Sequence, residues 1–330
     1  MSNSYLSKAE ALVVDNLMPG NQNVGVGSKL RNALQLGMGF KDGQKFYVSG
    51  TSGSDTAYDG LSWDTPFKTI QKAVDSCGNG RGDVIFVAPM PSAKYAENVV
   101  ILDHQSIKII APWGPWTTRL RVSDATTKKA ITPVGGTATA GCGFVVLSRD
   151  VEITGFGIDG GGGYCGIYCG DGYNIDSVNY DENTAGCHFH GNHFLDASNY
   201  GVILDGCSGN VLVENNIFER FVYAGVEVVP GGSRTCQRPI IRGNTFLGAG
   251  YGVHLYSSAT TVGVQVIGNT FCDVSASAMT KSCLFQGAGI HFFMGNFDCT
   301  ANKMTGSSTD FMAGNSEGRA GTGHTYVSEA

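Results

Sequence analysis

Acid–base side chains recur at one point of a repeated phrase in the second half of the chain. Glu227, His254 and His291 each stand two places after a glycine. If the repeats stack as strands about 4.8 Å apart, these side chains form one outward row. A carboxylate beside imidazoles suits general acid–base catalysis, or a metal ion held by two histidines and a carboxylate. Outward rows are also polar surface or subunit interface, so the three residues are weak candidates and no catalytic residue is assigned.

A second cluster consists of His188, His190 and His193. In a strand followed by a turn, His188 and His190 share one face and His193 lies past the turn. A zinc site is one alternative for this cluster. Nothing else in the sequence indicates a metal or an organic cofactor, and we expect neither.

The chain has only three tryptophans: Trp63, Trp113 and Trp116. Trp113 and Trp116 belong to the segment Pro112-Trp-Gly-Pro-Trp116, which we expect to be a loop that projects from the body. Prolines restrict this loop, and exposed tryptophans are favoured anchors for partners. We therefore expect Trp113 and Trp116 to bind a partner, which includes the possibility of a surface glycan.

A sequence repeat of 24 to 28 residues must position these side chains. Its marker is an asparagine two places before an aromatic residue, and the spacings between successive copies are 24, 28 and 25 residues; the markers are Asn192, Asn216, Asn244 and Asn269. A weaker copy surrounds Asn302. Such a period is too short for a propeller blade and fits one coil of a parallel β-solenoid.

Within a coil, apolar residues alternate with polar ones, as in Val264-Gln-Val266, so each coil buries a strip that only the next coil covers. The asparagine column is expected at an inward turn, with a left-handed backbone and side-chain amides that hydrogen-bond along the axis. We also expect a glycine column at positive-φ turn positions; its members are Gly166, Gly201, Gly225, Gly252 and Gly289.

The entry to the repeats has its own signals: a strand from Phe46, a short helix over Lys68–Asp75 and a strand within Gly82–Pro89. This segment resembles the N-terminal entry of right-handed parallel β-helix proteins of the pectin-lyase-like superfamily, over residues 46 to about 305. The residues that carry the resemblance are Phe46-Tyr-Val-Ser, Asp55, Trp63-Asp-Thr-Pro-Phe67, Gly82-Asp-Val-Ile-Phe-Val-Ala-Pro and Tyr95-Ala-Glu-Asn98.

The resemblance implies an all-β right-handed parallel β-helix whose short helix caps one end. Pectate lyases of that superfamily use clustered Asp residues for calcium and an Arg as base. This sequence shows no Asp-rich outward patch with a matching Arg on a neighbouring coil. The likeness therefore specifies the fold and leaves the function open.

Composition excludes several classes of protein. Glycine is about twice its average share, at 48 of 330 residues, and only 15% of residues are charged, which suits short strands and tight turns. A net charge of −6 argues against nucleic-acid binding. No apolar run approaches the roughly 20 residues of a membrane span, and the N-terminus lacks the features of an export signal. We expect the ten cysteines to be reduced, small core residues.

We expect an arm over residues 1–44, a β-helix over 45–305 and a Gly/Ser-rich tail over 306–330. The arm has too little apolar surface to fold alone, although Ser7–Leu17 has a capping box and the length for three helical turns. We expect the arm to dock onto a partner; its expected contact residues are Tyr5, Leu12, Val13, Leu17, Leu30, Leu34 and Phe40.

A short β-helix with an arm and a surface of small residues resembles virion proteins of tailed bacteriophages. The resemblance implies a structural protein, a capsid decoration or cement protein, assembled in the host cytoplasm as a homotrimer on the major capsid protein or on tail or neck proteins. The alternative is a tail spike, a receptor-binding protein with glycan binding or polysaccharide lyase or hydrolase activity. Few residues remain for a C-terminal trimerisation module, so the expectation leans away from an enzyme.

Overall fold

The structure is a computed structural model. It describes residues 43–90, 93–121, 131–133, 141–159, 164–170, 173–175, 178–180, 184–195, 199–221, 223–229, 236–248, 251–256, 261–262, 264–272, 281–286, 303–305 and 312–314. The chain divides between Gln44 and Lys45 into two units. The helix expected over Ser7–Leu17 and the expected contact residues of the arm lie outside the described residues, so that part of the prediction stays untested.

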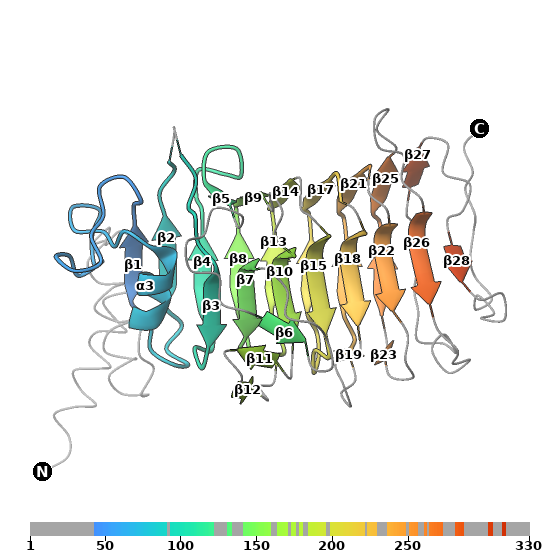
Figure 1. Cartoon of the computed structure of the whole chain (residues 1–330), viewed down its shortest axis with the longest axis horizontal. Coiled ribbons are helices and arrows are strands. Elements are labelled where there is room, and N and C mark those ends of the chain that lie inside the picture. Colours follow the sequence, from blue (N-terminus) through green and yellow to red (C-terminus); the bar gives the residue numbers. More distant parts are fainter. Residues whose placement is uncertain are drawn as a thin grey trace, which may run out of the picture. The chain divides into compact units, whose positions relative to one another are not determined.

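Three parallel sheets wind together into a β-helix, in which neighbouring strands of a sheet come from successive coils (Figure 1). Sheet A contains β1 (Lys45–Val48), β2 (Val84–Val87), β4 (Lys108–Ile110), β8 (Glu152–Thr154), β13 (His188–His190), β16 (Leu212–Glu214), β20 (Ile240–Arg242) and β24 (Gln265–Ile267). Sheet B contains β5 (Arg119–Arg121), β9 (Gly157–Asp159), β14 (His193–Leu195), β17 (Ile217–Glu219), β21 (Thr245–Leu247), β25 (Thr270–Cys272) and β27 (Lys303–Thr305). Sheet C contains β3 (Val99–Leu102), β7 (Cys142–Leu147), β10 (Cys165–Gly170), β15 (Tyr200–Asp205), β18 (Ala224–Val229), β22 (Tyr251–Tyr256), β26 (Lys281–Gln286) and β28 (Met312–Gly314). The all-β parallel β-helix that the sequence predicts is confirmed.

The short helix forms close to where it is predicted. Helix α3 (Ile70–Ser76) begins after Thr69, whose hydroxyl accepts a hydrogen bond from the backbone N–H of Lys72. Its apolar face is buried on β1, β2 and β3, and so closes the core beside the first coils (Figure 1). The carboxylate of Glu97 accepts the backbone N–H groups of Ile70 and Gln71, which satisfies donors that a helix start leaves open.

The asparagine column is a ladder of buried side-chain amides. Nδ2 of each of the first three asparagines donates to Oδ1 of the next, at 3.2, 3.1 and 3.0 Å; the four residues are Asn192, Asn216, Asn244 and Asn269. Each Nδ2 also donates to a backbone carbonyl of the preceding coil, for example that of Asn244 to Val213 at 2.9 Å. The structural role predicted for these residues is confirmed.

The backbone of the column differs from the prediction in one respect. The left-handed residue is the one before each ladder asparagine, with φ of 62°, 54°, 63° and 63° at Gly191, Asn215, Gly243 and Gly268. The positive-φ residue makes the turn, which leaves the following asparagine free to point its amide along the axis. Three of the four turn residues are glycine, which adopts this conformation without a steric penalty.

The glycine column was predicted at positive-φ turns. This is wrong for the first four members, of which Gly252 lies in β22, and Gly289 lies outside the described residues. Gly166, Gly201 and Gly225 lie in strands of sheet C and face a stack of phenylalanine rings. The stacked rings are 4.7–4.9 Å apart and nearly parallel; they are Phe194, Phe218, Phe246 and Phe271. A Cβ at Gly225 would lie 2.5 Å from Cδ1 of Phe246. The glycines recur because the ring stack leaves no room for a side chain.

Strands also form where none is predicted. Strand β6 (Ile131–Pro133) pairs antiparallel with β11 (Tyr173–Ile175), the partner of β12 (Val178–Tyr180). A further parallel pair is β19 (Cys236–Gln237) with β23 (Thr261–Val262). Strand β28 continues sheet C beyond residue 305, inside the expected tail.

Seven cysteines are buried free thiols, and their burial agrees with the small core residues that the sequence predicts; they are Cys77, Cys142, Cys165, Cys169, Cys187, Cys207 and Cys236. Within the described ranges, no helix has the length and apolar character to cross a membrane.

The first testable prediction concerns the glycine column. Gly225→Ala is expected to lower the free energy of unfolding by about 2–3 kcal/mol, because the added methyl group must displace the Phe246 ring. Urea unfolding followed by circular dichroism measures this change. Gly209→Ala is the matched control, since nothing lies within 4 Å of the added Cβ. Equal stability of the two variants would contradict the steric account.

Candidate functional site

The outer face of sheet A carries a continuous row of side chains that changes in character along the axis. The strand register aligns, in order, Tyr47, Phe86, Ile110, Thr154, His190, Glu214 and Arg242. Seven strands about 4.8 Å apart give a row roughly 29 Å long. The row therefore begins with aromatic side chains and passes to ionisable ones before it reaches Ile267 on β24.

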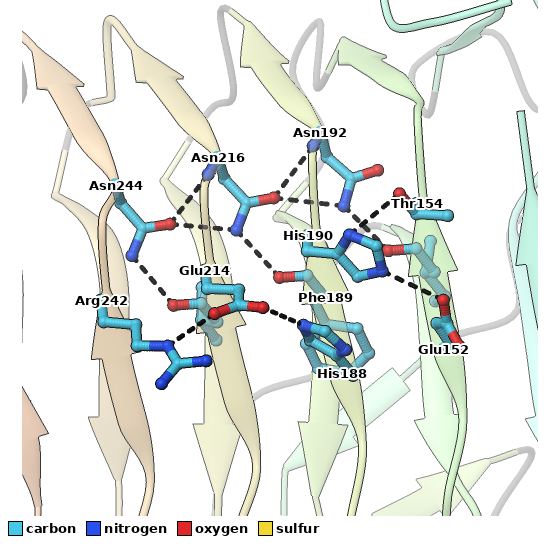
Figure 2. A network of polar contacts seen from close by, with 12 residues as sticks. Glu152, Thr154, His188, Phe189, His190, Asn192, Glu214, Asn216, Arg242 and Asn244 are labelled. Carbon is cyan, nitrogen blue, oxygen red and sulfur yellow. Dashed lines mark hydrogen bonds and ion pairs between the residues drawn. The ribbon is translucent and has the colours of Figure 1, made fainter. Parts of the chain in front are cut away.

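Two imidazoles stand at the centre of the ionisable part (Figure 2). The rings of His188 and His190 are stacked, with centroids 4.1 Å apart and planes at 29°. Both come from β13 and point to the same face of sheet A, as their spacing predicts. Their side chains are 30% and 29% exposed, so solvent and ligands reach them.

Each imidazole is held by a carboxylate from a neighbouring coil. Nε2 of His190 lies 3.1 Å from Oε1 of Glu152, and its Nδ1 lies 3.3 Å from the hydroxyl oxygen of Thr154. Nζ of Lys108 lies 2.6 Å from the other carboxylate oxygen of Glu152. The hydroxyl, the imidazole, the carboxylate and the ammonium group therefore form one chain of contacts.

The second imidazole has its own carboxylate and cation. Nε2 of His188 lies 2.9 Å from Oε1 of Glu214, and Nε of Arg242 donates to Oε2 of Glu214 at 2.6 Å (Figure 2). Among the described residues, Nδ1 of His188 has no hydrogen-bond partner. A neutral His188 that donates from Nε2 thus presents a basic nitrogen to solvent.

The surroundings of these groups determine which of them are charged at neutral pH. Burial lowers the pKa of His188, and the adjacent His190 lowers it further, so the ring is neutral. Partial burial by itself would raise the pKa of Glu152, but hydrogen bonds from Lys108 and His190 outweigh it and lower the pKa. Arg242 does the same for Glu214. The face combines ionised carboxylates with at least one neutral imidazole.

Tryptophans from two loops extend the aromatic end of the row. Tyr47 contacts Phe86 and Trp63, with ring centroids 5.7 and 4.8 Å apart, and Trp63 meets Trp113 edge-to-face at 5.3 Å. Trp63 and Trp113 remain 43% and 50% exposed. Exposed rings that are held by other rings form a rigid apolar platform.

Trp116 lies on a different face from Trp113. The loop Pro112–Thr117 crosses β9 at Gly157, where a Cβ would lie 2.1 Å from the carbonyl oxygen of Pro115. Trp116 then contacts the ring of His193 on β14, at a centroid distance of 4.4 Å, and stays 69% exposed. The structure thus separates the predicted anchors: Trp113 joins the row on sheet A, and Trp116 joins sheet B.

His193 is separated from the other two histidines by the turn, as predicted. It is buried, and its Nε2 lies 3.1 Å from Oε2 of Glu219. In the described part of the chain, no group of three or more His, Cys, Asp or Glu side chains is arranged to hold a metal ion. The zinc alternative for the three histidines therefore finds no support in these side chains.

The predicted row of acid–base residues on sheet C is assembled only in part. Glu227 and His254 are register neighbours, and Oε2 of Glu227 lies 3.0 Å from Nδ1 of His254. The next residue in register is Leu284, because β26 is Lys281–Gln286; His291 lies outside the described residues. The prediction that His291 is the neighbour of His254 in this row is wrong, because Leu284 takes that place.

Glu227 and His254 are only 5% and 7% exposed. Burial raises the pKa of the nearby Tyr200, and the charge of Glu227 raises it further. A paired, buried carboxylate and imidazole stabilise each other and offer little access to a substrate. Their catalytic role stays an untested prediction, and the accessible face of sheet A is the stronger site.

A protein-family model described as "Right handed beta helix region" matches residues 140–305, half of the chain. The chain belongs to the right-handed β-helix family. The matched segment of this β-helix protein includes β8 and β13, which carry the imidazole network, whereas Trp63 and Trp113 lie before it.

Comparisons with individual proteins do not indicate which reaction or ligand belongs to this β-helix protein. No curated protein matches its sequence. The native GH136 lacto-N-biosidase from Eubacterium ramulus shares 12% identity at a TM-score of 0.45 over 85% of this chain, which spans 58% of the length of that enzyme. The rice weevil pectin methyl esterase shares 12% identity at a TM-score of 0.35, over 79% of this chain and 90% of its own. At these scores the likenesses support no conclusion about activity.

Sequence reasoning missed Glu152, Thr154, Glu214 and Arg242. A signal was present, because each residue of the outer row on β13, β16 and β20 stands two places before a ladder asparagine. The coil that contains Glu152 and Thr154 lacks that marker, because Phe156 stands where the other coils have the ladder asparagine. The backbone N–H of Phe156 donates to Oδ1 of Asn192.

The second prediction concerns the imidazole pair. His190→Asn is expected to raise the pKa of His188, because the substitution removes a neighbouring positive charge, whereas Glu214→Gln is expected to lower it. Titration of the His188 ring by NMR measures both shifts. Gln265→Ala, on the same sheet but three strands away, should leave the titration unchanged. Shifts in the same direction in both variants would contradict the electrostatic account.

Proposed function

We propose that this β-helix protein binds a linear carbohydrate along the outer face of sheet A. The observation that carries the proposal is the exposed pair Trp63–Trp113, packed on Tyr47 at the start of the row. Sugar rings have an apolar face of C–H groups and a rim of hydroxyls. Rigid aromatic side chains contact the face at a low cost in conformational entropy.

The polar part of the row supplies groups that suit the hydroxyl rim. Carboxylates accept hydrogen bonds, guanidinium groups donate them, and a neutral imidazole does both. In this face Glu214 and Arg242 follow His190 on the next two strands along the axis. Binding sites combine apolar and aromatic surface with a few placed polar groups, and this row has both.

The geometry of the scaffold also suits a polymer. Parallel coils repeat at one spacing, so a chain laid along the axis meets successive strands at regular intervals. Of the virion roles named above, receptor binding by a tail spike is the one that a carbohydrate-binding face would serve. Lyase or hydrolase activity on the same glycan is part of that alternative.

The virion role itself rests on the sequence. We propose that residues 1–44 dock the protein onto the major capsid protein or onto tail or neck proteins, as a homotrimer. The expected contact residues of the arm lie outside the described residues, and a decoration or cement role depends on them.

The third prediction tests the carbohydrate face. The double variant Trp63→Ala/Trp113→Ala is expected to weaken polysaccharide binding at least tenfold, or more than about 1.4 kcal/mol, because the platform is lost. Isothermal titration calorimetry against a panel of bacterial polysaccharides measures the affinity. Trp116→Ala is the matched control on sheet B and should bind as the unaltered protein does. Loss of binding in the control alone, or no binding to any member of the panel, would reject the proposal.

The fourth prediction tests the arm. A variant without residues 1–44 is expected to fold, because the core cluster of the β-helix begins at Phe46, and to fail to associate with virions. Circular dichroism measures the fold, and co-sedimentation with virions that lack the protein measures the association. Full association of the shortened chain would contradict the docking role.

A further inference from the structure

One half of the polar network on sheet A is arranged as the parts of a hydrolytic triad (Figure 2). The hydroxyl oxygen of Thr154 lies 3.3 Å from Nδ1 of His190, and Nε2 of the same ring lies 3.1 Å from Oε1 of Glu152. A hydroxyl, an imidazole and a carboxylate in this order are the groups that nucleophilic acyl transfer requires. Such a triad is recognised by geometry and roles, whatever the fold.

We propose that Thr154, His190 and Glu152 hydrolyse esters, and that the substrates are short acyl groups on hydroxyls of a glycan bound to sheet A. Thr154 and His190 are the catalytic residues, and Glu152 is a positioning residue that acts through His190. The identity of the substrate rests on the proposed carbohydrate binding, whereas the hydrolytic chemistry rests on the triad alone.

The sheet holds the three groups in place. Thr154 and Glu152 project from β8, and His190 projects from the neighbouring strand β13, directly in register with Thr154. Lys108 on β4 fixes the second carboxylate oxygen of Glu152. A site built on strands keeps its geometry better than one built on loops.

The contacts also assign the proton positions. Glu152 is ionised at neutral pH and only accepts, so Nε2 of His190 carries the hydrogen. Nδ1 then carries the lone pair and faces the hydroxyl of Thr154. This is the tautomer that a general base for Thr154 needs.

The hydroxyl of Thr154 has a glycine on one side. Gly191 has no side chain, and a Cβ there would lie 3.4 Å from Oγ1 of Thr154. On the other side, the register neighbour of Thr154 is Ile110, which is partly buried. We infer from this apolar neighbour that the acyl group is small and apolar, such as acetyl.

The reaction proceeds in two balanced steps. Oγ1 of Thr154 attacks the ester carbonyl while its proton passes to Nδ1 of His190; the bond to the sugar oxygen breaks, and that oxygen leaves with the proton from His190. Water then attacks the acyl-threonine ester, giving its proton to His190. The bond between Thr154 and the acyl group breaks, Oγ1 recovers the proton, and a carboxylic acid is released.

The fifth prediction compares hydrolysis of p-nitrophenyl acetate, and release of acetate from an acetylated polysaccharide, by the full chain and its variants. Thr154→Val, which is similar in size, is expected to lower the rate about a thousandfold, whereas Thr154→Ser should lose far less because it retains a hydroxyl nucleophile. Thr245→Val, on β21 of sheet B, is the matched control and should have no effect. Mass spectrometry of the rapidly quenched reaction should show an acetyl group on Thr154.

Glu152→Gln tests the positioning role. The turnover number should fall and KM should stay unchanged, because Glu152 contacts the ring of His190 and no part of the substrate. A merely structural Glu152 would change both constants or neither.

The outcomes separate the two proposals. If Thr154→Val hydrolyses the ester as fast as the unaltered chain, the proposed triad is wrong. Attack on the ester by an imidazole without Thr154 would give this result. Absence of hydrolysis of both substrates would overturn it as well. Hydrolysis of p-nitrophenyl acetate without polysaccharide binding would retain the triad and reject the carbohydrate face.

Discussion

The stacking of each coil on the next, in strict register, is the constraint on which the rest of this protein depends. A single coil is too small to bury its inner strip, so its apolar residues are covered only by neighbouring coils. The asparagine ladder fixes that stacking, because each buried amide must find both of its partners on adjacent coils. An unpartnered buried amide costs about 1–3 kcal/mol, so a slip in register would be penalised at every step of the ladder.

The same constraint accounts for the composition. The Phe194–Phe271 stack fills one side of the interior and excludes side chains from Gly166, Gly201 and Gly225. Separate positive-φ residues, such as Gly243, make the turns that aim the asparagines. Glycine is therefore abundant for two unrelated reasons, room for rings and turn conformation, and the sequence pattern alone does not distinguish them.

Register also creates the outer surface. Rows of side chains about 4.8 Å apart run along the axis, so groups distant in sequence become neighbours without any special loop. His190 and Glu152 are 38 residues apart and yet in contact. On sheet A this produces an accessible row that passes from the Trp63–Trp113 platform to a neutral imidazole and ionised carboxylates, whereas on sheet C it produces a buried Glu227–His254 pair.

The amino-acid sequence by itself determined the fold class, the asparagine ladder and the inward faces of the strands. These follow from a local period and from apolar alternation, which are properties of single coils. Only the tertiary structure decided which outward residues meet. The asparagine marker relates His190 to Glu214, but the coil of Thr154 has Phe156 at that position, so the place of Thr154 beside His190 cannot be counted along the chain. The separation of Trp113 from Trp116 likewise depends on a loop that crosses β9 at Gly157, a contact between coils that no local pattern records.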